Sequence, residues 1–181
     1  MTTRTLWLWW SRWRADQCGA AAVEFALILP LMLVLYVGGA EISQAAATYR
    51  KVTDTTVELA NIASQYTTMS AGDVSTVMNA SSQIMAPYPT HSLLIVLSEI
   101  TTDANSNATV TWSQPYNGAA ALAPGTAVTL PSGLASPSTS YMLVQTQYAF
   151  VPVISGYIGT IPMANQMYIL PRQSPSIPYT G

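Results

Sequence analysis

The sequence predicts an α+β protein, in which one long N-terminal membrane-spanning helix extends into a small extracytoplasmic domain with a short helix and a mainly antiparallel sheet. An apolar run over residues 20–40 predicts the membrane helix. Beyond residue 93, apolar residues cluster or alternate in short stretches between turn residues, which indicates a mainly antiparallel sheet. Only 8% of the residues are charged, against about a quarter in ordinary soluble proteins.

The run over 20–40 has the length and orientation signals of a single-pass span. At a rise of about 1.5 Å per residue, a helix of this length covers roughly 30 Å, the thickness of a bilayer core. Arg4, Arg12 and Arg14 precede the run and Glu41 follows it. Because positive flanks stay in the cytoplasm, we expect the N-terminus inside and the C-terminal domain outside the cytoplasmic membrane.

Three other interpretations of this run remain open. It could be a buried helix of a soluble domain, although uncharged runs much beyond 18 residues are typical of membrane spans. It could be a signal peptide cleaved after the small residues Gly38-Gly39-Ala40, or a plain uncleaved anchor. A lipoprotein signal at Cys18 is disfavoured, because polar residues precede it.

Glu24 distinguishes these interpretations. A carboxylate within a membrane run costs about 2.5–3.5 kcal/mol at the centre of the span and less near its edge. A mere anchor or signal peptide has no use for it, so Glu24 is a functional hypothesis that needs a cationic partner. Cleavage after Gly19 would give Ala20 a free amine four residues before Glu24.

These residues carry a family resemblance. A basic leader, a Gly, four small or apolar residues, a Glu and an apolar helix form the pattern of prepilins cut by prepilin peptidase. The stretch G-A-A-A-V-E-F-A-L-I-L-P-L from Gly19, preceded by R-x-R-x-D-Q-x-G, resembles the TadE/TadG-like family of the tight-adherence pilus system. The C-terminal Y-A-F-V-P-V-I-S-G and I-L-P-R also resemble that family.

The resemblance implies a minor pilin or pseudopilin, a structural subunit that packs through its N-terminal helix during pilus assembly. Gly19 and Ala20 would form the processing site, and Glu24 would set the register between neighbouring helices. The implied partners are other pilin or pseudopilin subunits, the prepilin peptidase and the inner membrane. The alternative is an uncleaved bitopic membrane anchor that presents an extracytoplasmic binding domain, and a second competitor is a membrane-tethered enzyme.

The chain is expected to divide into five segments: a basic leader 1–19, a transmembrane helix 20–40, a helical stalk 41–69, an α+β domain 70–172 and a disordered tail 173–181. Apolar residues at spacings of three and four, without Pro or Gly over 41–70, predict that the first helix continues to about Gln65. The remaining expected elements are a helix over 71–85, strands over 93–100, 108–113, 142–150 and 163–170, and a loop over 114–138.

Little in the sequence favours catalysis, cofactors or nucleic acid. The net charge is −2, which gives no basic surface for nucleic acid, and phosphate-binding glycine motifs are absent. His91 is the lone histidine, and we expect no metal or small-molecule substrate. Asp103-Ala-Asn105-Ser-Asn107 mimics the start of a calcium loop but equally suits a hairpin turn. The apolar stretch Val151–Met163 is either a loop covering the core or an exposed patch.

Overall fold

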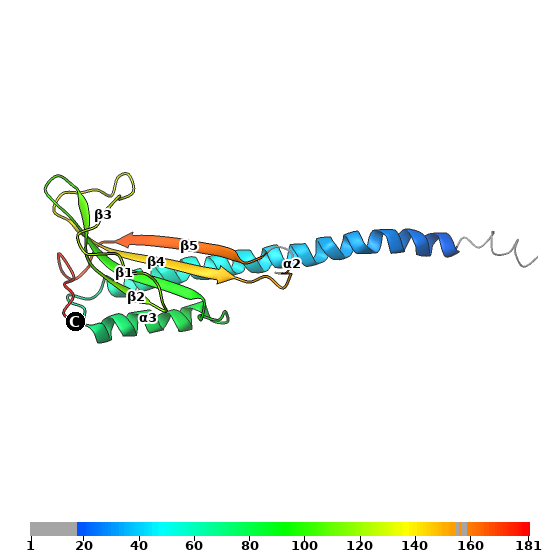
Figure 1. Cartoon of the computed structure of the whole chain (residues 1–181), viewed down its shortest axis with the longest axis horizontal. Helices are drawn as coiled ribbons and strands as arrows, with labels where there is room; N and C mark the ends of the chain where they lie inside the picture. Colours follow the sequence, from blue (N-terminus) through cyan, green and yellow to red (C-terminus); the bar gives the residue numbers. More distant parts are fainter. Residues whose placement is uncertain (1–17, 155, 157–158) are drawn as a thin grey trace, which may run out of the picture. The chain divides into compact units, whose positions relative to one another are not determined.

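The computed structural model describes residues 18–154, 156 and 159–181, with elements in the order α2, α3, β1, β2, β3, β4, β5 (Figure 1). The predicted leader therefore lies outside the described residues as far as residue 17. The chain divides after Gln44 into two compact units. We call the second unit, Ala45–Gly181, the domain.

Helix α2 spans Cys18–Ala63, 46 residues, and continues through Pro30. Its part from Gly19 is long and apolar enough to cross a membrane. The prediction that the helix extends well past the apolar run is confirmed. The stalk predicted over 41–69 is not a separate segment, however, because α2 ends at Ala63 and belongs to the domain from Ala45 onward.

Helix α3, Ala71–Met85, has the predicted bounds. Its start is fixed by a capping box, in which the Asp73 N–H donates to the Ser70 hydroxyl (3.3 Å) and the Ser70 N–H donates to the Asp73 carboxylate (2.9 Å). The Ser70 hydroxyl also donates to this carboxylate, and the hydrogen bonds from Ser70 lower the pKa of Asp73. The predicted apolar face is buried at Val74, Val77, Met78 and Met85.

The sheet has five strands in the order β3-β2-β1-β4-β5, and every pairing is antiparallel. Its strands are β1 (Leu93–Thr102), β2 (Ala108–Tyr116), β3 (Ala127–Val128), β4 (Ser140–Phe150) and β5 (Ile161–Ile169). The four predicted strands and the hairpin between the first two are confirmed. The predicted loop over 114–138 is wrong at two points, because β2 continues to Tyr116 and β3 pairs with β2.

Both faces of the sheet are covered within the domain. The larger core cluster combines sheet residues such as Leu97 and Val144 with Leu59 of α2 and Met78 of α3. A smaller cluster around Ile100, Val110, Tyr141 and Leu143 is packed by partly buried side chains that include Leu122 and Leu130 of the β2–β4 connection. This double cover explains why the central strand β1 is apolar without alternation.

The prediction of a disordered tail over 173–181 is wrong. Ile177 is fully buried, and its neighbours pair with the chain between α2 and α3. The Met69 N–H donates to the Pro178 carbonyl (3.0 Å), and the Thr180 N–H donates to the Met69 carbonyl (2.9 Å). The three prolines of residues 171–181 favoured an extended or disordered chain, but the tail is held by distant partners.

Candidate functional site

Gly19, Ala20 and Glu24, the residues predicted from the prepilin-like motif, lie in the first turns of α2 and are exposed. Ala20 and Glu24 are separated by about one helical turn, so they share one face of the helix. The large apolar side chains that follow, from Phe25 to Tyr36, are also exposed. The helix therefore presents an apolar surface with one carboxylate in its N-terminal part.

Glycine at position 19 is not required by packing among the described residues. A Cβ built on Gly19 meets nothing within 4 Å, and the same holds for Gly39 further along α2. Gly19 also has ordinary helical geometry rather than a positive φ. A requirement for glycine at position 19 must therefore come from something other than the fold.

Two polar contacts hold the domain part of α2 against the sheet. The Thr56 and Thr146 hydroxyls are fully buried and hydrogen-bond to each other at 2.6 Å. The Asn165 amide of β5 donates to the Thr53 hydroxyl at 2.9 Å. Because buried hydroxyls need partners, these pairs fix the position of the helix along β4 and β5.

A buried carboxylate that sequence reasoning missed organises the C-terminal tail. Glu99 of β1 is 1% exposed. One of its oxygens accepts hydrogen bonds from the Ser140 hydroxyl (2.6 Å) and from the Ile177 N–H (2.7 Å). The Trp112 indole N–H donates to the Ile177 carbonyl (2.8 Å), so both backbone groups of this tail residue are satisfied by the sheet. We call Glu99, Trp112, Ser140 and Ile177 the tail clamp.

The tail also meets the end of α2. The Arg172 N–H donates to the Ser64 carbonyl (2.8 Å), and its guanidinium donates to the Asn61 side chain (3.1 Å). The Tyr179 ring packs on Trp112 with centroids 5.5 Å apart. These contacts tie the C-terminus to the helix end and to the sheet.

The calcium-like stretch forms a hairpin turn. One Asp103 oxygen accepts from the Asn105 and Asn107 N–H groups (both 2.8 Å), and the other accepts from the Asn107 side chain (2.9 Å). These bonds, the Asn107 side-chain bond foremost, lower the pKa of Asp103. The described residues contain no group of three or more His, Cys, Asp or Glu side chains suited to a metal. His91 is exposed, and its carbonyl accepts from the Asn117 side chain.

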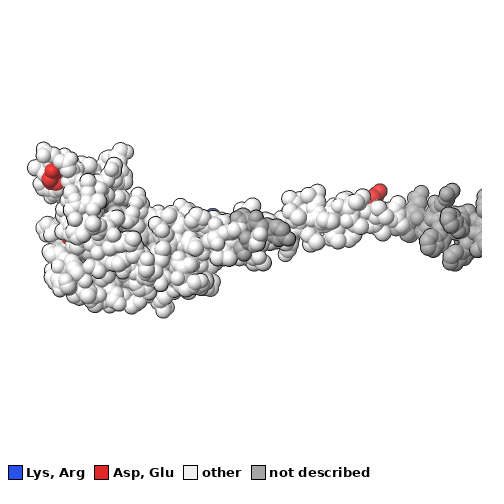
Figure 2. Space-filling model, viewed as in Figure 1, with Lys and Arg blue, Asp and Glu red and all other residues white. Residues whose placement is uncertain are grey.

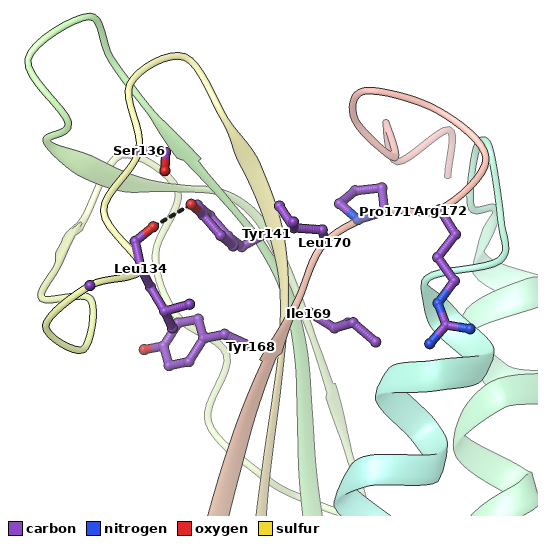
Figure 3. Close-up of a pocket in the computed structure, with 9 residues that line it drawn as sticks. Leu134, Ser136, Tyr141, Tyr168, Ile169, Leu170, Pro171 and Arg172 are labelled. Carbon is purple, nitrogen blue, oxygen red and sulfur yellow. Dashed lines mark hydrogen bonds between the residues drawn. The ribbon is translucent and has the colours of Figure 1, made fainter.

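An open pocket of about 510 Å³ lies where the β2–β4 connection meets the end of β5 (Figure 3). Tyr141 and Tyr168 line it, and the Tyr141 hydroxyl donates to the Leu134 carbonyl. Burial raises the pKa of the Tyr168 hydroxyl. Arg172 stands at the opposite rim (Figure 3), but its guanidinium is bound to Asn61. The pocket therefore offers aromatic surface and hydroxyl groups.

Charge is scarce throughout. Figure 2 shows this face of the described chain as almost entirely free of charged side chains. No Asp, Glu, Lys, Arg or His occurs between Asp103 and Arg172. Residues 155, 157 and 158 of the apolar stretch Val151–Met163 lie outside the described residues. Among the others, Val151 is 62% and Val153 83% exposed, while Pro152 and Met163 are buried.

Together these features define a protein in which the described residues contain one candidate membrane helix and an α+β domain. The family model described as TadE-like protein matches residues 19–61, which are the apolar run and most of the domain part of α2. The match confirms the resemblance predicted from the Gly19 motif, and it associates the chain with tight-adherence pilus assembly. No curated protein and no solved structure matches the chain.

Proposed function

We propose that the protein is a minor pilin or pseudopilin of a tight-adherence pilus, a structural subunit rather than an enzyme. The observation that carries the proposal is the TadE-like match over 19–61. In this segment Gly19, Ala20 and the Glu24 carboxylate lie at the start of an exposed apolar helix. The helix would be anchored in the inner membrane with the domain in the periplasm, and it would pack against helices of sibling subunits.

Glu24 gives the proposed packing its register. After cleavage, Ala20 would carry a free α-amine, which could act as the cationic partner of Glu24. In an apolar layer an isolated charge is costly, and pairing an amine with a carboxylate of a neighbouring helix relieves both costs. One axial stagger satisfies Glu24, and other staggers leave a buried charge. A pair within one chain is the competing arrangement, since Ala20 and Glu24 share a helix face.

The mature N-terminus tests the processing step. We expect the intact mass of the purified membrane form to correspond to a chain that begins at Ala20. Gly19→Val should leave the full-length form, whereas Gly39→Val should be shortened normally, because both sites are open in the fold. A mature chain beginning at Glu41 would establish a signal peptide, and normal shortening of Gly19→Val would refute processing by prepilin peptidase.

The register role is tested by Glu24→Gln, which keeps the size of the side chain and removes its charge. We expect normal insertion and cleavage but reduced co-purification of sibling pilins and reduced surface piliation at matched protein level. Glu58→Gln is the control, because Glu58 is an exposed carboxylate on the domain part of α2. Wild-type piliation with wild-type partner recovery in Glu24→Gln would contradict the register role.

The second candidate is an uncleaved bitopic anchor whose domain binds a ligand. The open pocket lined by Tyr141 and Tyr168 favours it. This candidate requires that the membrane form retain Met1. It also requires that Gly19→Val and Glu24→Gln leave ligand binding by the domain unchanged. The mass measurement therefore decides between the two candidates.

A further inference from the structure

The connection between β4 and β5 exposes an apolar tip, which we define as Val151, Val153 and Ile154. Val153 is 83% exposed, more than any other large hydrophobic side chain described in the domain, and Val151 is 62% exposed. Ile154 is half-buried. Exposed single apolar residues are common, but two in one short connection, beside a third that is half-buried, indicate a surface that contacts another apolar surface.

The contacts of β5 with α2 locate this tip. The Asn165 side chain of β5 bonds to Thr53 of α2, and just past the C-terminal ends of both elements the Arg172 N–H bonds to the Ser64 carbonyl. Strand β5 therefore runs in the same direction as α2. From Asn165 back to the start of β5 at Ile161 is about 13 Å at 3.3 Å per residue. The same distance along the helix is about nine residues at 1.5 Å each, which reaches the start of the domain near Ala45.

The tip thus lies at the end of the domain where the chain enters from its apolar segment. The apolar run ends at Ala40 and the domain begins at Ala45. Even a fully extended chain covers at most about 18 Å over five residues, whatever the angle between the two units. If 20–40 spans the bilayer, this end of the domain is tethered close to the membrane surface.

We propose that the β4–β5 tip docks on the outer lipid interface of the membrane that α2 spans. Lipid is the occupant that fits, because no Asp, Glu, Lys, Arg or His lies between Asp103 and Arg172, so contact with lipid desolvates no charge there. An exposed apolar patch marks a protein interface or a membrane interface, and the position of the tip near the end of the apolar run favours the membrane. The tip rests the domain on the membrane before assembly, and its role depends on the membrane helix but not on pilus formation.

Lipid contact is measured on the full chain reconstituted in phosphatidylcholine vesicles. Cys18 is replaced by Ser, Val153 by Cys, and the new thiol is labelled with an environment-sensitive fluorophore. Leu134→Cys in the same background is the control, because Leu134 is also an exposed apolar residue, 37% exposed. Its carbonyl accepts from Tyr141 near the start of β4, roughly 30 Å along the strand from the tip. Val151→Cys supplies an independent label at the tip.

We expect bromine-substituted lipids to quench the labels at 153 and 151, and their emission to shift to the blue, with neither effect at 134. Aqueous iodide should quench the label at 134 more strongly than the tip labels. The same pattern in zwitterionic and anionic vesicles would confirm an apolar contact. Equal iodide quenching at all three positions without lipid quenching would overturn the proposal. Protection of the tip labels only after sibling subunits are added would overturn it in favour of a protein interface.

Discussion

The tail clamp predicts that one side chain of the C-terminal tail contributes strongly to the stability of the domain. Ile177 is fully buried in the larger core cluster, although it lies in the segment for which the sequence predicted disorder. Replacing a buried Ile by Ala removes the transfer free energy of the lost methyl and methylene groups and leaves a cavity, which together cost about 2–5 kcal/mol. We therefore expect Ile177→Ala to lower the free energy of unfolding by about 3 kcal/mol.

This loss is large enough to measure and small enough to leave a folded protein. Domains are typically stable by about 5–15 kcal/mol. For a domain of this size, each kcal/mol shifts the melting temperature by about 3–4 °C, so Ile177→Ala should melt about 10 °C below wild type. Thermal unfolding of the detergent-solubilised full chain, followed by near-ultraviolet circular dichroism, reports on the packing of Trp112 and Tyr179, which contact each other.

A matched control separates burial from a general effect of changing the tail. Gln173 is exposed in the same tail, so Gln173→Ala should stay within about 0.5 kcal/mol of wild type. Trp112→Phe keeps an aromatic ring but leaves the Ile177 carbonyl without its donor, at a cost of about 1–3 kcal/mol. Equal melting temperatures for wild type, Ile177→Ala and Gln173→Ala would refute the clamp and restore the prediction of a disordered tail.

Three further predictions follow from single contacts. Thr56→Val should lower the free energy of unfolding by about 1–3 kcal/mol in urea titrations, because it leaves the buried Thr146 hydroxyl without its Thr56 partner; no change would mean that the pair is dispensable. Folding lowers the pKa values of Asp73 and Asp103, so these carboxylates stabilise the folded domain above about pH 4, and the stabilisation is lost as pH falls through the folded-state pKa values. Asp103→Asn should therefore reduce the loss of stability at acid pH, and an unchanged profile of stability against pH would contradict this prediction. A periplasm-dependent reporter fused after Gly181 should be active, since positive flanks stay in the cytoplasm, and activity of a cytoplasm-dependent reporter instead would invert the topology.

Much of the fold was predictable because local patterns determine it. The capping box before Asp73 and the prolines after Met85 set the bounds of α3, and the alternation of Met142, Val144 and Tyr148 matches the face of β4 that enters the larger core cluster. The long apolar run predicted the candidate membrane helix, and the Gly19 motif predicted the match to the TadE-like model.

The unpredicted features depend on contacts between residues far apart in sequence. Glu99 and Ile177 are 78 positions apart, and Trp112 and Ile177 are 65 apart, so no local pattern shows that the proline-containing tail is held. One signal was available: Glu99 and Trp112 lie on strands expected to be buried, and buried polar groups require hydrogen-bond partners. The role of Glu24 was predictable only as far as a motif allows, because its proposed partner belongs to another chain.

Glu24 stands apart from the few other charged side chains of the described chain. Within the domain, Asp73 accepts hydrogen bonds in a helix cap, Asp103 accepts them in a turn, and Glu99 accepts one from the tail. Lys51 donates to the Ile84 carbonyl. Arg50, Asp54 and Glu58 are exposed on the domain part of α2, where water solvates them. Glu24 differs, because it is exposed on an apolar helix surface that a bilayer or a filament would cover. No described residue supplies a cationic partner for Glu24, and a carboxylate buried in an apolar environment without such a partner is costly. Under the proposed function, the partner of Glu24 is the amine that cleavage after Gly19 would create at Ala20 of the same or a neighbouring subunit.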